Sequence, residues 1–183
     1  MNVYDWDKTI YDGDSSIDFY KHCLKKYPSI SKYWPRQMRA MSQYKRRKIT
    51  KTEMKTVFYE YFQSIPNIGQ EVQIFWDENE HKIKSWYYDQ KRDDDLIISA
   101  SPDFLLRPMM NKLGIALIAS DVNPLSGENM QENCYGPEKV RRMKLEYDIN
   151  EMEEFYSDSY SDDPLAQFAQ KSYLVKGDER LPW

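Results

Sequence analysis

Short apolar segments alternate with helical patterns throughout the part of the sequence that follows Asp95, and this alternation strongly restricts the possible folds. The segments have the composition of strands that are buried on both faces of a sheet. Strands are predicted at residues 96–98, 115–119, 155–156 and 173–175. Because strands that alternate with helices are typical of a parallel sheet with helices on both faces, the sequence predicts an α/β core.

A long helical segment separates this region from the N-terminal residues. Residues 1–13 predict one short strand followed by a loop, whereas residues 14–90 show apolar spacings of three and four residues. Thr50 or Thr52 can cap one of these helices. The predicted organisation is an α/β core formed by residues 1–13 and 91–183, with an all-helical cap, residues 14–90, inserted after the first strand.

The composition is that of a folded protein rather than a disordered one, with 40% hydrophobic and 31% charged residues in 183. The net charge of −4 argues against nucleic acid as a partner, because proteins that bind the phosphate backbone are usually basic. No apolar run long enough to span a membrane and no signal-peptide pattern are seen, so stable membrane association is not expected. Cys23 and Cys134 are expected to be free thiols in a reducing cytoplasm, and the alternative is one disulfide in a secreted protein.

Reactive side chains follow the predicted strands directly, and ligands of open parallel sheets bind at the carboxyl ends of the strands. The side chains expected to meet there are Asp5 and Asp7 after the first strand, Ser99 after the second, Lys139 near a helix start, and Asp158 and Asp162 after the strand at residues 155–156. Four carboxylates in one site repel one another, and a divalent cation would offset their charge. Since the donors are oxygens, with no His or Cys, they favour Mg²⁺ over Zn²⁺.

A phosphoryl group would complete such a site, because it needs both cationic and hydrogen-bonding partners. Mg²⁺, Lys139 and Ser99 would supply them. One aspartate can then attack phosphorus and form an aspartyl phosphate. A second carboxyl group can protonate the leaving oxygen and later take a proton from water.

Four segments together carry a resemblance to a known family. They are Asp5-Trp6-Asp7-Lys8-Thr9, Ile97-Ile98-Ser99-Ala100-Ser101-Pro102, Gly136-Pro137-Glu138-Lys139 and Ser157-Asp158-Ser159-Tyr160-Ser161-Asp162. Their order resembles the haloacid dehalogenase superfamily of phosphohydrolases, and the helical segment between the first two resembles the phosphoserine phosphatase and phosphatidylglycerophosphate phosphatase C-like branch. The resemblance implies a Rossmann-like core, Mg²⁺ as cofactor and hydrolysis of phosphomonoesters.

The resemblance also implies a role for each matching residue. Asp5 matches the nucleophile, which also ligates Mg²⁺. Asp7 matches the general acid/base, whose backbone carbonyl is a second metal ligand. Ser99 and Lys139 match the pair that binds the phosphoryl group, and Thr9 matches the residue that supports the loop.

The fourth motif completes the implied metal site. Asp158 matches the third protein ligand of Mg²⁺, and Asp162 matches an acid that orients Lys139 or a metal-bound water. Two positions depart from the family's pattern: Trp6 replaces a Phe- or Leu-like residue, and Ser157 replaces the common Gly. Neither departure removes a catalytic group.

Two positions have a close competitor in the sequence. Ser101 competes with Ser99 for the phosphate, and the resemblance favours Ser99, the first residue after the apolar run. Asp163 competes with Asp162, and the spacing of four residues from Asp158 favours Asp162. Asp163 precedes a proline and suits the N-cap of the following helix.

The cap is expected to select the substrate, but nothing in residues 14–90 identifies one. Asp14 can face the cleft where the chain leaves the core, although helix capping is the favoured interpretation. The basic run Lys45-Arg46-Arg47-Lys48 can be a solvated surface or can attract an anionic substrate.

The sequence therefore predicts a Mg²⁺-dependent phosphohydrolase that acts on a small phosphorylated metabolite. The alternative is a phosphate-binding or phospho-relay module without turnover. Asn or Ser in place of Asp5 or Asp7 would favour that alternative, and both aspartates are intact. The order of the motifs differs from that of receiver domains, whose phosphorylated Asp lies on a middle strand. The sequence predicts neither the particular substrate nor the oligomeric state.

Overall fold

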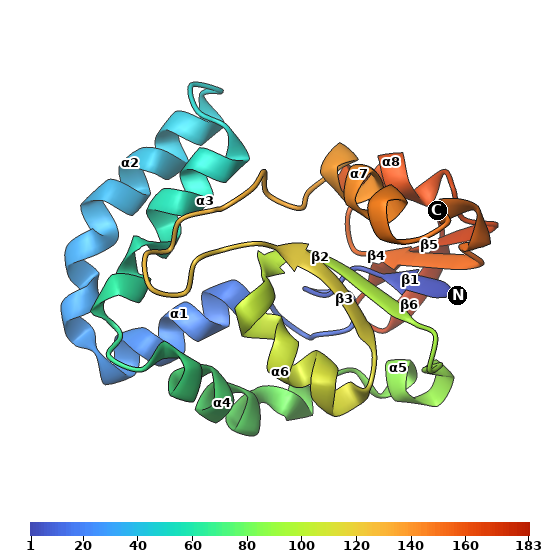
Figure 1. Cartoon of the computed structure of the whole chain (residues 1–183), viewed down its shortest axis with the longest axis horizontal. Helices are drawn as coiled ribbons and strands as arrows, with labels where there is room; N and C mark the ends of the chain where they lie inside the picture. Colours follow the sequence, from blue (N-terminus) through green and yellow to red (C-terminus); the bar gives the residue numbers. More distant parts are fainter.

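A six-stranded sheet forms the centre of the computed structural model, which describes residues 1–183 (Figure 1). The strands are β1 (Asn2–Tyr4), β2 (Leu96–Pro102), β3 (Ala116–Ser120), β4 (Glu154–Ser157), β5 (Lys171–Lys176) and β6 (Glu179–Pro182). Their order in the sheet is β3-β2-β1-β4-β5-β6. The first five strands are parallel, which confirms the predicted Rossmann-like α/β core.

One strand of the sheet was not predicted, and it is the only antiparallel one. β6 pairs antiparallel with β5, and all of its residues are exposed, so it lacks the apolar pattern that marks a buried strand. Gly177 has a φ of +58° and allows the tight turn between the two strands. β2 also continues beyond residue 98, where the apolar run ends, as far as Pro102.

Alternate residues of the strands face opposite sides of the sheet, and helices cover both sides. Tyr4 and Ile97 belong to one hydrophobic cluster, which includes residues of α4 and α6. Val3 and Ile98 belong to a second cluster, which includes residues of α7 and α8. These helices are α4 (Ile68–Asn79), α6 (Asp103–Leu113), α7 (Pro137–Glu146) and α8 (Asp163–Ala166). The carboxyl ends of the strands are left open between the two layers.

Residues 14–90 are helical as predicted. Besides α4 they form α1 (Ser15–Lys26), α2 (Trp34–Lys45), α3 (Lys51–Tyr59) and α5 (Ser85–Gln90), with short 3₁₀ segments at Pro28–Tyr33, Glu60–Ser64 and Glu80–Lys82. Thr50, rather than Thr52, caps α3 and forms a capping box with Glu53. No helix in the structure has both the length and the apolar character needed to cross a membrane.

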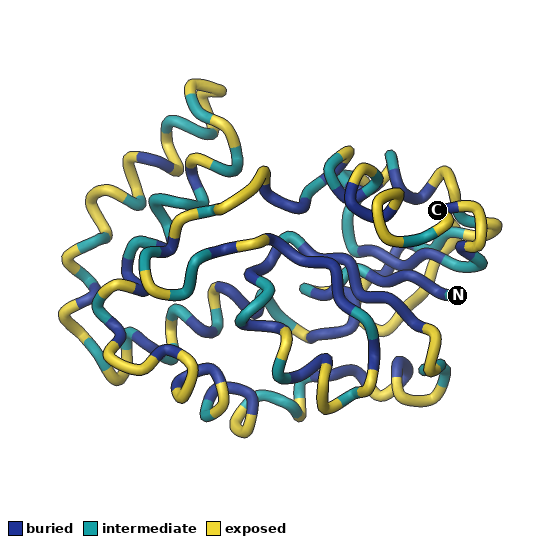
Figure 2. The backbone as a smooth tube through the Cα atoms, viewed as in Figure 1, coloured by how far each residue is buried: buried dark blue, intermediate teal, exposed yellow.

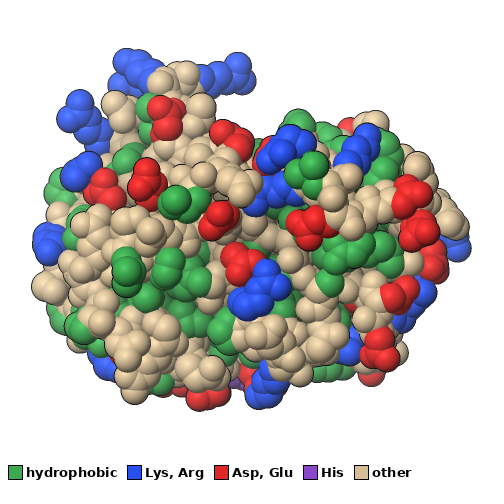
Figure 3. All heavy atoms as spheres, in the orientation of Figure 1, with side chains coloured by type: hydrophobic (Ala, Val, Ile, Leu, Met, Phe, Trp, Pro, Cys, Tyr) green, Lys and Arg blue, Asp and Glu red, His purple; other side chains and the backbone are tan.

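Only α2 and α3 project from the body of the molecule (Figure 1). α2 is mostly exposed (Figure 2), and Ala40 is its only buried residue. The four basic residues 45–48 are all exposed at the turn between the two helices, where basic side chains gather in Figure 3. The structure therefore places this basic run on the solvated surface.

The remaining helices of the insertion pack directly on the core. The indole N–H of Trp76 in α4 donates a 2.5 Å hydrogen bond to the Leu105 carbonyl of α6. In α5 the ring of Tyr87 lies 5.1 Å from that of Tyr4 in β1. One hydrophobic cluster spans both parts of the chain, so the division into a core domain and a cap domain stays a prediction.

Glu71 links two helices of the insertion although its side chain is only 3% exposed. Its carboxylate accepts hydrogen bonds from Lys26 at 2.6 Å and from the Tyr27 hydroxyl at 2.8 Å, and it lies 3.2 Å from Nε2 of His22. Burial alone would raise the pKa of Glu71, but these hydrogen bonds lower it below its ordinary value. The ionised carboxylate therefore stabilises the packing of α1 against α4.

We predict that Glu71→Gln lowers the free energy of unfolding by about 1–3 kcal/mol at neutral pH, the typical contribution of hydrogen bonds to a charged group. The folded-state pKa is depressed, so the stabilisation is complete above the unfolded carboxyl pKa and is lost as the pH falls through the folded pKa. Urea denaturation at neutral and acidic pH measures the difference. Asp77→Asn on the same helix is the control, since Asp77 is exposed and forms no ion pair. Equal losses in the two variants would contradict the role given to Glu71.

Candidate active site

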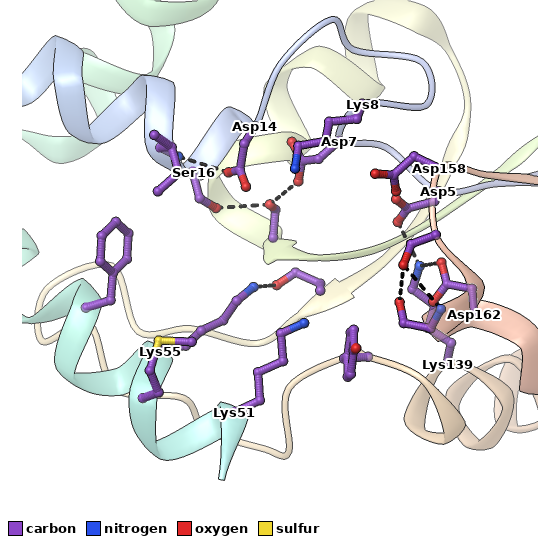
Figure 4. A pocket seen from close by; sticks show the side chains of 18 of the residues that line it. Asp5, Asp7, Lys8, Asp14, Ser16, Lys51, Lys55, Lys139, Asp158 and Asp162 are labelled. Carbon is purple, nitrogen blue, oxygen red and sulfur yellow. Dashed lines mark hydrogen bonds and ion pairs between the residues drawn. The ribbon is translucent and has the colours of Figure 1, made fainter. Parts of the chain in front are cut away.

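A pocket of about 360 Å³ lies at the carboxyl ends of β1, β2 and β4 (Figure 4). The sheet side of the pocket carries five of the residues singled out in the sequence: Asp5, Asp7, Lys139, Asp158 and Asp162. Helices α1 and α3 supply the opposite wall. The core and the helical insertion therefore both line the pocket, as expected of a site that closes over a small ligand.

Lys139 joins two of the predicted aspartates at the base of the pocket. Its ammonium lies 2.7 Å from Oδ1 of Asp5 and 2.7 Å from Oδ2 of Asp162, and the lysine is 1% exposed. The Ser157 hydroxyl donates a further bond of 2.8 Å to Asp162. Burial raises the pKa of Asp5 to about 7, although the charge of Lys139 acts in the opposite direction. Burial alone would lower the pKa of Lys139, but the charges of Asp162 and Asp5 raise it above its ordinary value.

The side chain of Asp7 lies beside the first residue of α1, and both of its carboxylate oxygens accept hydrogen bonds. The Ser15 N–H donates to Oδ1 at 2.6 Å, and the Ser101 hydroxyl donates to Oδ2 at 2.5 Å. Burial and the charge of Asp14 raise the pKa of Asp7 to about 6, while the bonds from Ser101 and Ser15 lower it. This carboxyl group can therefore exchange a proton near neutral pH.

The residues between and after the two aspartates hold them in place. Trp6 is completely buried and packs against Tyr11 and Trp76, with ring centroids 6.1 and 5.9 Å away. The large indole thus anchors the loop in the core while its neighbours line the pocket. Thr9 does not line the pocket, but its Oγ1 accepts a 2.9 Å hydrogen bond from the Asp158 N–H. The first and fourth motifs are therefore joined through Thr9.

The two competing serines have different surroundings. Ser101 lines the pocket, and its hydroxyl lies 3.0 Å from that of Ser16 in addition to bonding Asp7. Ser99 is 1% exposed and does not line the pocket. The Ser99 Oγ accepts a 3.1 Å hydrogen bond from the Ser101 N–H, and its own proton has no acceptor in the structure. The structure therefore brings Ser101, rather than Ser99, into the pocket.

The structure also gives the positions of Asp163 and Asp14, for which the sequence left alternatives open. Asp163 lies outside the pocket, where its carboxylate accepts from the Trp183 indole at 3.0 Å. It is the first residue of α8, and its side chain makes no capping bond, so the expected N-cap was wrong. Asp14 combines both of its interpretations, because it accepts from the Ile17 N–H at 3.0 Å and also lines the pocket.

Two lysines of α3 were missed in the sequence. Lys51 and Lys55 both point into the pocket (Figure 4). Burial and the charge of Lys55 lower the pKa of Lys51 to about 8, and burial lowers the pKa of Lys55. Their spacing of four residues after the Thr50 cap is the signal that could have placed them on one face of a helix.

The loop between β3 and α7, residues 121–136, runs alongside α3 and is called the strap here (Figure 1). The Asn129 side chain donates to the Thr56 hydroxyl at 2.9 Å, and the Asn133 N–H donates to that of Thr52 at 3.0 Å. At Gly127 an added Cβ would lie 2.1 Å from the Tyr59 carbonyl oxygen. The strap therefore fixes α3 over the pocket.

The donor atoms of the pocket suit a hard divalent cation, because the anionic side chains that line it are all carboxylates. The carboxylate of Asp158 accepts no hydrogen bond, and the buried Oδ1 of Asp162 has no partner. No three Asp, Glu, His or Cys side chains form a preassembled metal site in the structure. The chemistry fits a cation that keeps several waters among its ligands, as Mg²⁺ does.

The chain belongs to the haloacid dehalogenase-like hydrolase family, whose model matches residues 3–167. It is therefore a hydrolase of that family, and the resemblance seen in the four motifs is confirmed. No curated protein sequence matches the chain significantly.

Several solved structures share the fold of this chain. The chain is similar to a protein of unknown function from Bordetella pertussis Tohama I, with a TM-score of 0.80, 18% identity, and coverage of 95% of this chain and 88% of that one. It is also similar to a phosphoserine phosphohydrolase-like protein from Francisella tularensis subsp. tularensis SCHU S4 (TM-score 0.60, 15% identity, coverage 97% and 88%). A phosphoserine phosphatase in a phospho-aspartyl intermediate analogue form matches with a TM-score of 0.58 and 13% identity, over 94% of this chain and 84% of that one.

We predict that Gly127→Ala destabilises the protein more than Gly177→Ala. Both glycines have positive φ, so both variants lose about 1–2 kcal/mol from backbone strain. Only Gly127 also faces a clash, because nothing lies within 4 Å of a Cβ at Gly177. Urea denaturation gives the two losses, and amide hydrogen exchange should show increased exchange in the strap for Gly127→Ala alone. Equal losses and unchanged exchange would show that the strap is not held against α3.

Proposed function

We propose that the protein is a Mg²⁺-dependent phosphatase that cleaves a small phosphomonoester through an aspartyl phosphate on Asp5. The observation that carries the proposal is the Asp5 carboxylate itself, which lines the pocket and is held by Lys139 at 2.7 Å. Membership of a hydrolase family supports the reaction class. The phosphoserine phosphatase among the structures of similar fold supports phosphate as the group that is cleaved.

In the proposed reaction Asp5 attacks phosphorus, and the bond between phosphorus and the leaving oxygen breaks. Asp7 protonates that oxygen, and then takes a proton from the water that hydrolyses the aspartyl phosphate. Lys139 neutralises charge on the phosphoryl oxygens. Asp5, the Asp7 backbone carbonyl and Asp158 would hold Mg²⁺. When bound, Mg²⁺ would neutralise the carboxylates and polarise the phosphoryl group.

We predict that hydrolysis of an activated aryl phosphate requires both Mg²⁺ and Asp5. Asp5→Asn should lower kcat by at least about a thousandfold, because the amide keeps the shape but is no nucleophile. EDTA should abolish turnover, and added Mg²⁺ should restore it. Asp12→Asn is the matched control, because Asp12 is exposed and does not line the pocket. Turnover by Asp5→Asn within a few-fold of wild type would reject the proposal, and a folded protein that binds phosphate without any turnover would favour the phosphate-binding alternative.

We predict different effects for the two serines of the second motif. The four motifs assign phosphoryl binding to Ser99, which has a free hydroxyl proton, although Ser101 and not Ser99 lines the pocket. If Ser99 binds the phosphoryl group, Ser99→Ala should weaken inhibition by inorganic phosphate about tenfold, the value of one hydrogen bond to a charged group. Ser101 positions Asp7, so Ser101→Ala should lower kcat and shift its pH profile without a comparable loss of phosphate affinity. The reverse pattern would assign the phosphate to Ser101.

A further inference from the structure

The pocket contains a pair of cations that the proposed chemistry does not use. Lys51 and Lys55 lie one helical turn apart on α3, and both line the pocket (Figure 4). The Lys55 ammonium donates to the Ala100 carbonyl at 2.6 Å, and that of Lys51 lies 3.1 Å from the centroid of the Tyr135 ring. Like charges at this spacing repel each other on a helix, so their joint burial in one pocket has a cost.

No carboxylate of the protein forms an ion pair with either of these two lysines. Neither ammonium has an Asp or Glu oxygen within 4.0 Å, whereas Lys139 has two such partners at 2.7 Å. Several carboxylates of the pocket bond other groups. Asp7 accepts hydrogen bonds from Ser15 and Ser101, and Asp5 and Asp162 bond Lys139. The pocket therefore has carboxylates and one paired lysine at the strand ends, and two lysines without ion-pair partners on α3.

Apolar side chains lie beside the two lysines. Ile17, Met41, Met54 and Phe58 line the same pocket. These side chains belong to α1, α2 and α3, so a ligand that reaches α3 from the strand ends would meet apolar groups as well as the two lysines. A wall of this kind favours a short carbon skeleton over a second polar group in the middle of the ligand.

We propose that the substrate carries a second phosphoryl group, which Lys51 and Lys55 bind while the first is cleaved at Asp5. The inference rests on the proposed phosphatase function and names its substrate class, bisphosphorylated small molecules. The charge decides between the possible anions: a phosphate monoester carries about −1.5 to −2 at neutral pH and can balance both lysines, whereas a carboxylate balances only one. Each ammonium has further protons to donate to phosphoryl oxygens.

The test compares three series of alkyl phosphates that differ only in the far end of the chain. They are simple alkyl phosphates, ω-carboxyalkyl phosphates and alkanediol bisphosphates, each with a range of methylene numbers. Phosphate release gives kcat/KM for every compound. We expect kcat/KM for the best bisphosphate to exceed that for the best carboxylate by about tenfold and that for the best alkyl phosphate by about a hundredfold. These values assume that each charge-assisted hydrogen bond contributes about tenfold. The two equivalent ends of a bisphosphate account for only a factor of about two.

Lysine variants assign this preference to α3. Lys51→Met and Lys55→Met should each reduce the ratio of kcat/KM for bisphosphate over alkyl phosphate by about tenfold. Lys55→Arg should retain most of it. Lys25→Met is the control, because Lys25 is exposed on α1 and does not line the pocket. Thermal unfolding shows whether each variant is folded.

The outcomes separate this inference from the phosphatase proposal. Absence of aryl phosphate hydrolysis in the wild type rejects the phosphatase itself. Hydrolysis of aryl phosphate with equal kcat/KM for the three series rejects the second anion site. A carboxylate as good as the bisphosphate rejects the second phosphoryl group. A bisphosphate preference that survives in folded Lys51→Met and Lys55→Met places the second group elsewhere in the pocket.

Discussion

The active site is organised around the ammonium of Lys139, which lies between two carboxylates that are 134 and 23 residues away in the sequence. Removing this cation from water is costly, and its two ion pairs offset that cost only because their geometry is good. The arrangement depends on the sheet order, since β1 and β4 are adjacent and present Asp5 and Asp162 at the same edge. It also depends on Gly136, whose φ of +56° turns the chain into α7 and toward Ser161. The main effect of Lys139 is therefore to hold the carboxylates of Asp5 and Asp162 in place, rather than to increase the stability of the fold.

Much of the fold could be predicted from the sequence because it follows from local patterns. The apolar run at residues 96–98 identified a strand. Gly114 directly follows α6 and has the left-handed conformation typical of a helix C-cap, so the residue type itself indicates the helix end. The convergence of Asp5, Lys139 and Asp162 followed from the rule that ligands bind at strand ends. These features depend on residue type and order, which the sequence contains directly.

Other features depend on which surfaces face each other, and the sequence does not contain that information. β6 is exposed on every residue, and it is recognisable only through its pairing with β5. Ser99 and Ser101 lie two residues apart at the end of one strand, where the register of β2 against β3 is irregular, so their environments could not be distinguished by spacing. Lys51 and Lys55 belong to the pocket only because α3 lies over the strand ends, and the sequence does not show that placement.

The strap restricts how α3 can move to admit a ligand to the pocket. The helical insertion is joined to the core by its two chain ends and by the packing of α4 and α5. The strap adds a connection to α3, because it runs alongside that helix and bonds it through Asn129 and Asn133. Movement of α3 away from the sheet therefore requires the hydrogen bonds between α3 and the strap to break first. A ligand too large for the mouth of the pocket could therefore enter only after those hydrogen bonds break.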